Sequence, residues 1–117
     1  MKHRIKEKQA TISMLGHNPF NTGSNIIFTC ENQGQQPVRW FKNGFILDYD
    51  IENNSRMKVN LSTLFIAEIY GNGRLLTISD VLESDSGLYS CAAGPTAILS
   101  KSLAVNVTGM RFIDFSV

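Results

Sequence analysis

Histidine and cysteine are scarce in this chain of 117 residues, which has two of each. The histidines are His3 and His17, and the cysteines are Cys30 and Cys91. The sequence has no Cys-x-x-Cys, His-Glu-x-x-His, Gly-x-Ser-x-Gly or phosphate-loop pattern, the usual marks of zinc, hydrolase and nucleotide sites. We therefore expect no metal, no cofactor, no small-molecule substrate and no catalytic residue, and we interpret both histidines as surface residues.

An excess of one charge and long apolar runs are also lacking. Eleven basic residues balance ten acidic ones, for a net charge of +1, which does not favour a nucleic-acid partner. No run of about 18 apolar residues occurs, so we expect no direct membrane insertion. The basic lead at residues 1–8 is followed by no apolar stretch, so we do not interpret it as a secretory signal. We interpret it as a solvated terminus, with an electrostatic contact arm as the alternative.

The apolar residues that are present recur with a period of two, which is the period of β-strands. Short alternating runs end in turn residues such as Asn43-Gly44 and Gly94-Pro95, and one helical turn is expected within Asp80–Asp85. This pattern predicts an all-β sandwich or barrel of one domain. The residues expected to share a face within each strand are Ile26, Phe28 and Cys30; Val38, Trp40 and Lys42; Leu76 and Ile78; Tyr89, Cys91 and Ala93; and Leu103, Val105 and Val107.

Two cysteines, a tryptophan and a tyrosine occur in a characteristic order and spacing. Trp40 follows Cys30 by ten positions, and Tyr89 precedes Cys91 by two. This constellation resembles the core signature of the immunoglobulin superfamily. The stretch Trp40–Gly44 is similar to that of intermediate-set domains, and Asp85–Cys91, with Leu76 before it, is similar to the strands and corner near the second cysteine.

The resemblance implies an immunoglobulin-like sandwich of two antiparallel sheets with Greek-key topology. It also implies an inter-sheet disulfide between Cys30 and Cys91, covered by Trp40, and a Tyr89 hydroxyl that bonds back to the preceding loop. Arg56 is expected to pair with Asp85. We expect the domain to span residues 9–108, followed by a tail or linker at 109–117.

The chain departs from the intermediate set in length, because 61 positions separate Cys30 from Cys91, nearer to the variable set. The excess lies between Phe45 and Gly73, where we expect extra edge strands or a long hairpin. Thr63–Tyr70 carries apolar residues on both faces, so we predict a strand joined to Arg74–Ile78 through a Gly71-Asn72-Gly73 turn. The last strand lacks a Phe-Gly-x-Gly bulge, which argues against an antigen-receptor variable domain.

The function that the resemblance implies is protein recognition or adhesion by an extracellular, cell-surface or secreted protein. The partners would be other proteins, including another immunoglobulin domain or a second copy. The alternative is a cytoplasmic structural domain of a giant sarcomeric or cytoskeletal protein, in which the cysteines are reduced. The candidate partner surface, which combines grouped apolar residues with a strand-connecting loop, consists of Phe41, Phe45, Ile46, Leu47, Pro95 and Ile98.

Three sequons mark candidate N-glycosylation sites, at Asn53, Asn60 and Asn106. A chain with this many asparagines contains one or two by chance, so their number alone says little. Asn106 falls on an outward-facing position of the last predicted strand and Asn53 in a polar loop, where a glycan fits.

Overall fold

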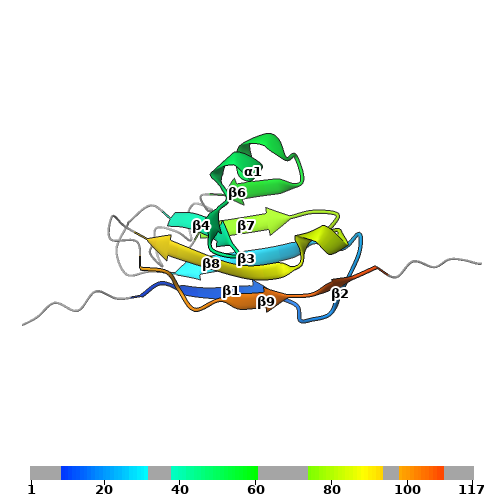
Figure 1. Ribbon diagram of the computed structural model, residues 1–117, viewed down its shortest axis with the longest axis horizontal. Helices are drawn as coiled ribbons and strands as arrows, with labels where there is room; N and C mark the ends of the chain where they lie inside the picture. The colour runs from blue at the N-terminus through cyan, green and yellow to red at the C-terminus, as the bar shows by residue number, and fades with distance from the viewer. Residues whose placement is uncertain (1–8, 32–37, 61–73, 94–97, 110–117) are drawn as a thin grey trace, which may run out of the picture.

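The computed structural model describes residues 9–31, 38–60, 74–93 and 98–109. These residues form two four-stranded antiparallel sheets packed face to face (Figure 1). In strand order, the first sheet comprises β1 (Thr11–Leu15), β3 (Ile26–Glu31), β7 (Arg74–Ile78) and β6 (Met57–Asn60). The second comprises β5 (Phe45–Ile46), β4 (Val38–Lys42), β8 (Gly87–Ala93) and β9 (Leu103–Val105). The predicted sandwich is confirmed.

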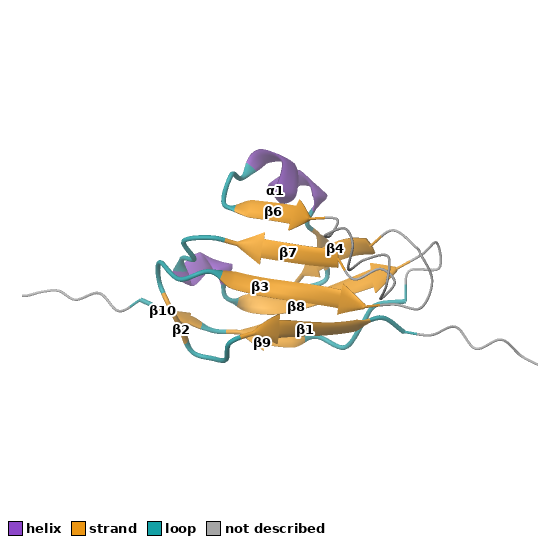
Figure 2. Ribbon diagram, turned by 180° about the vertical axis from the view of Figure 1, so that it is seen from behind, coloured by secondary structure: helices purple, strands orange, loops and turns teal. Residues whose placement is uncertain are grey.

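A short parallel pair closes one end of the seam between the sheets. It joins β2 (Phe20–Asn21) to β10 (Val107–Thr108). Two short helices complete the described part, α1 (Asp48–Asn53) and the 3₁₀ turn η1 (Glu83–Asp85), which lies within the predicted Asp80–Asp85 stretch. Figure 2 shows α1 and β6 at one edge of the sandwich and β9, β2 and β10 at the other. No helix of the described residues is long and apolar enough to cross a membrane.

The predicted alternation of apolar residues places one row of each strand in the core. Successive strand side chains point to opposite faces, so Ile26, Phe28 and Cys30 are fully buried while Ile27 and Thr29 are not. The side chains that are almost completely buried come from both sheets, which makes one continuous core: Trp40, Tyr89, Phe28, Ile26, Leu76, Ile78, Val81, Cys30 and Cys91.

The β4–β5 hairpin turns at the predicted Asn43-Gly44 pair. Both residues have positive φ, 52° at Asn43 and 83° at Gly44, the condition for the two-residue turn that matches strand twist. The Asn43 side chain also accepts the backbone N–H of Leu88 at 2.9 Å. The turn is thereby tied to β8, which fixes where β5 and its side chains lie.

The region of excess length is only partly strand. After β5 the chain forms α1, which the alternation did not predict, and then β6, which pairs with β7. Among the described residues, one added strand, β5, lies beside β4, whereas variable-set domains add two strands to this sheet. The predicted strand Thr63–Tyr70 and its Gly71-Asn72-Gly73 turn lie outside the described residues.

Candidate functional site

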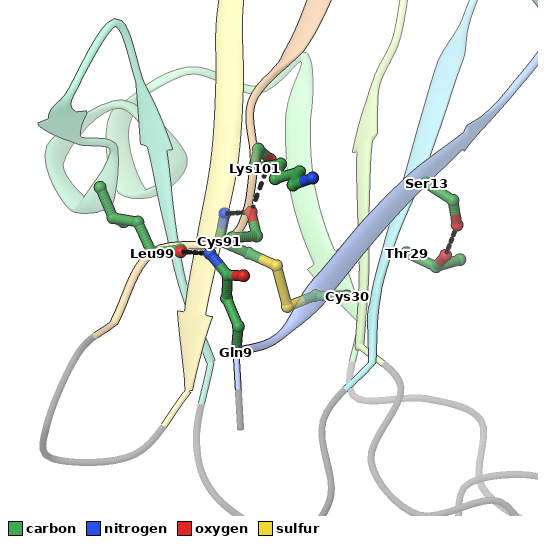
Figure 3. Close-up of a disulfide and its surroundings, with 8 residues drawn as sticks. Gln9, Ser13, Thr29, Cys30, Cys91, Leu99 and Lys101 are labelled. Atoms are coloured by element: carbon green, nitrogen blue, oxygen red, sulfur yellow. Dashed lines mark hydrogen bonds between the residues drawn. A yellow bond between two sulfur atoms is a disulfide. The ribbon is translucent and has the colours of Figure 1, made fainter. Parts of the chain in front are cut away.

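The disulfide between Cys30 and Cys91 joins β3 of one sheet to β8 of the other, as Figure 3 shows. The two Cα atoms lie 6.3 Å apart, and both cysteines are fully buried. Trp40, 1 % exposed, sits opposite Cys91 in the β4–β8 register. Phe28 packs between the aromatic rings, with its centroid 6.1 Å from that of Trp40 and 4.9 Å from that of Tyr89. This centre holds the two sheets, and so their outer faces, in fixed positions.

Hydrogen bonds among Tyr89, Asp85 and Arg56 stabilise the corner before β8. The Tyr89 hydroxyl donates to the backbone oxygen of Asp85 at 2.6 Å, the backward bond that the resemblance implies. The Asp85 carboxylate in turn accepts from Nη1 and Nη2 of Arg56, at 2.8 and 3.3 Å. The hydrogen bond to Asp85 raises the pKa of Arg56, although burial opposes it, and burial raises the pKa of Tyr89 well above its ordinary value.

Lys42 on β4 also contacts this corner, through its ammonium group. The prediction put Lys42 on the inward face with Trp40, where a buried charge would be costly. Its stem runs along that face, and its ammonium reaches out to the backbone oxygen of Ser84 at 2.6 Å. The ammonium also lies 5.9 Å from the centroid of the Tyr89 ring. The charge is therefore partnered rather than buried.

The outer face of the second sheet is apolar and poor in charge. Its outward positions follow from the register, which places Phe41 opposite Ile46 on β5 and opposite Ser90 on β8. Ile46 is 41 % exposed on this face, whereas Phe45, which is 76 % exposed, pairs with Lys42 and so points to the other side of the β5 edge. Of the outward positions of β4, β8 and β9, only Arg39 is charged. Phe41 is half-buried, Leu88 and Ala104 are exposed, and Ser90 and Ala92 are buried, at 3 % and 2 % exposed.

The outer face of the first sheet carries more polar side chains than that of the second. It carries mainly hydroxyl and charged side chains, and the hydroxyls of Ser13 and Thr29 hydrogen-bond across the strands at 2.8 Å. Its outward residues include Thr11, Ser13, Thr29, Glu31, Thr77 and Lys58, together with the half-buried Ile27 and Leu75 and with Leu15, which is 63 % exposed at the end of β1. The adjacent exposed residues Phe45 and Ile46 make the β5 edge of the second sheet the candidate partner surface among the described residues.

Not every residue predicted for this surface lies on it. Leu47 is 2 % exposed and packs into the core, because its N–H continues the pairing of β5 by donating to Trp40 O. Leu47 is therefore removed from the surface, and Phe41 is half-buried. Ile98 is 41 % exposed but lies before β9, on the far side of the sheet from β5. Pro95 lies outside the described residues.

Sequence reasoning missed two exposed apolar residues that flank the surface. Tyr49, 74 % exposed, lies on α1 directly after β5, and Leu88, 49 % exposed, faces outward on β8. Strand alternation could have found Leu88, since it lies one position before Tyr89. No period-two pattern could have found Tyr49, because it lies on a helix.

The three sequon asparagines lie in different settings. Asn53 is exposed at the end of α1, not in a loop, and its side-chain nitrogen donates to Tyr49 O at 2.8 Å. Asn60 is the last residue of β6. Asn106 is exposed between β9 and β10. Within the described ranges, no group of three or more His, Cys, Asp or Glu residues is placed to hold a metal ion.

Comparisons with known proteins agree with this architecture. A curated relative, Papilin from Caenorhabditis elegans, is 29 % identical over 83 residues, which cover 71 % of this chain and 3 % of the relative. The chain thus matches only a small part of that protein. A solved structure of tandem Ig repeats of Dlar matches with a TM-score of 0.54 and 20 % identity, covering 85 % of this chain and 46 % of that one. The family model for the immunoglobulin domain matches residues 9–94, and this chain belongs to that family.

Proposed function

We propose that this domain is a non-catalytic protein-recognition module that works outside the cell. One observation carries the proposal, namely the exposure of large apolar side chains at adjacent positions of the β5 edge. Grouped, exposed large apolar side chains on a water-soluble domain mark a surface that another protein covers. Phe45 and Ile46 are such side chains at the outer edge of the second sheet.

The disulfide supports the extracellular setting. Disulfides form and persist in oxidising compartments and are rare in the cytosol, and the Cys30–Cys91 bond closes at the centre of the core. The described residues contain no free cysteine that would point to a reduced environment. The alternative, a cytoplasmic structural domain, has no need of this bond, so we favour recognition or adhesion outside the cell.

The mechanism would be burial of an apolar centre within a polar rim. Ile46 and half-buried Phe41 form the centre on the outer face, and Phe45 adds an exposed aromatic ring at the same edge, on its other side. Asp48, Asp50 and Glu52 on α1 follow directly in the chain and would contribute to the rim. The partner is therefore a protein that offers an apolar contact surface, with basic groups beside it to meet the α1 carboxylates.

The test uses a labelled, multivalent form of the domain applied to tissue of the source organism. Phe45→Asp should abolish binding to the tissue, because it places a charge where an apolar contact forms. Leu15→Asp is the matched control, since it puts the same charge in place of an exposed apolar residue on the other sheet. Equal binding by Phe45→Asp and the unmodified domain would refute the proposed surface. Self-association lost in Phe45→Asp would identify a second copy as the partner.

A further inference from the structure

Asn106 lies at the break between β9 and β10, with its side chain turned to solvent. Burial alternates along this stretch: Ala104 and Asn106 are exposed, and Val105 and Val107 are buried. Asn106 therefore points to the same side as Ala104, away from the core. Together with Val107 and Thr108, Asn106 completes a sequon.

The backbone of Asn106 is fixed on both sides by other residues. Its N–H donates to Oδ1 of Asn18 at 2.7 Å, while the side-chain nitrogen of Asn18 donates to Ala104 O at 2.8 Å. Its carbonyl oxygen accepts the N–H of Phe20 at 2.8 Å. The side-chain amide of Asn18 thus pairs with the free edge of β9 as a neighbouring strand would. It holds Asn106 in place without using the Asn106 side chain.

Of the sequon asparagines Asn53 and Asn106, whose side chains the structure describes, Asn106 has the side-chain amide that is better suited to modification. Within the described residues, this amide makes no hydrogen bond, whereas the side-chain nitrogen of Asn53 is engaged with Tyr49 O. A group attached to the Asn106 amide nitrogen would break no contact of the fold. It would also leave the two bonds from Asn18 intact, because they involve only backbone atoms of Ala104 and Asn106.

We propose that Asn106 carries an N-linked glycan, an inference that rests on the proposed extracellular function. In the transfer, the Asn106 amide nitrogen forms a bond to the anomeric carbon of an oligosaccharide carried on a lipid diphosphate. The bond between that carbon and the diphosphate oxygen breaks, the lipid diphosphate leaves, and the amide nitrogen loses one proton. Thr108 supplies the hydroxyl that the acceptor sequence requires.

This glycan lies at the β9 edge of the second sheet, away from β5. Ala104 pairs with exposed Leu88, so a sugar on Asn106 lies on their side of the sheet, at the β9 edge. The docking residues Phe45 and Ile46 lie on β5 at the opposite edge. Three strand spacings separate these edges, roughly 14 Å at about 4.8 Å each. The glycan therefore lies nearer to Leu88 and Ala104 than to the β5 edge.

The test is to express the whole chain behind a secretory signal in insect or mammalian cells. Peptide mapping of the secreted protein should show Asn106 converted to aspartate by peptide N-glycosidase, with a matching loss of mass. Asn106→Gln and Thr108→Ala should each abolish this loss of mass. Thr108→Ser, which keeps the hydroxyl, and Asn53→Gln should retain it.

The state of the disulfide in the same sample separates the two proposals. Secreted protein with a closed Cys30–Cys91 bond and an unmodified Asn106 overturns the glycan while leaving the extracellular function standing. Protein that is retained in the cell with free thiols overturns the extracellular function and the glycan with it, since transfer occurs in the secretory pathway. Mass loss confined to the peptides that carry Asn53 or Asn60, with the Asn106 peptide unchanged by the enzyme, also refutes the site.

Discussion

Arg56 and Asp85 form an ion pair between the start of β6 and the corner before β8, with Nη1 and Oδ2 2.8 Å apart. Their side chains are 24 % and 6 % exposed, so solvent screens the arginine more than the carboxylate. The same carboxylate also accepts the Leu82 N–H at 2.8 Å. Removal of the arginine would leave a nearly buried carboxylate without its counter-charge.

Arg56→Met should therefore lower the free energy of unfolding by about 2 kcal/mol, between the values typical of exposed and fully buried pairs. Urea denaturation measures this change. Lys58→Met is the matched control, because Lys58 is exposed on β6, and it should change stability by less than about 0.5 kcal/mol. Equal losses from the two substitutions would show that the pair does not fasten the corner.

Tyr89 should make the domain less stable at alkaline pH. Burial raises the pKa of its hydroxyl above the ordinary value of 10.0, so above that pH the unfolded chain loses this proton first. Fewer bound protons in the unfolded state mean that stability falls as pH rises. The stability that the protonated Tyr89 hydroxyl contributes is fully present below about pH 10 and is lost as the pH rises further.

Urea denaturation of the unmodified domain and of Tyr89→Phe, at pH values from about 8 to 12, checks this. Tyr89→Phe should be less stable near neutral pH by about 1 kcal/mol, since the bond to Asp85 O is lost. It should also lose stability less steeply above about pH 10. Parallel pH curves for the two proteins would contradict the assigned burial of the hydroxyl.

Trp40 and Phe41 are neighbours in β4 with opposite surroundings. Trp40→Ala should destabilise the domain by about 3–5 kcal/mol, because Trp40 is 1 % exposed in the core. Phe41→Ala should cost about 1 kcal/mol, because Phe41 is half-buried on the outer face. Thermal or chemical denaturation gives both values. Equal losses would mean that the strand register is shifted by one residue.

The core was predictable from the sequence because alternation and burial have the same cause. A strand with one face in the core must place its apolar residues at every second position, and Ile26, Phe28 and Cys30 do so. The Asn43-Gly44 turn was predictable for a similarly local reason, since few residues other than asparagine and glycine accept positive φ.

The exposed residues were less predictable, because the local sequence pattern does not show which distant parts of the chain pack against a residue. Leu47 follows two exposed residues in an apolar run, yet it is buried where the chain leaves β5 for α1. Asn18 carried no sequence signal, because its two bonds go to the backbone of residues far along the chain. Only the packed arrangement of the strands brings those residues together.

The central claim is that this immunoglobulin domain works outside the cell, and the redox state of Cys30 and Cys91 in native material tests it most directly. Protein from tissue of the source organism would be alkylated without prior reduction, digested and analysed by mass spectrometry. The account predicts that the two cysteine peptides are recovered joined by a disulfide and carry no alkyl label. Free labelling of both thiols in folded protein would contradict the claim and favour the cytoplasmic structural alternative.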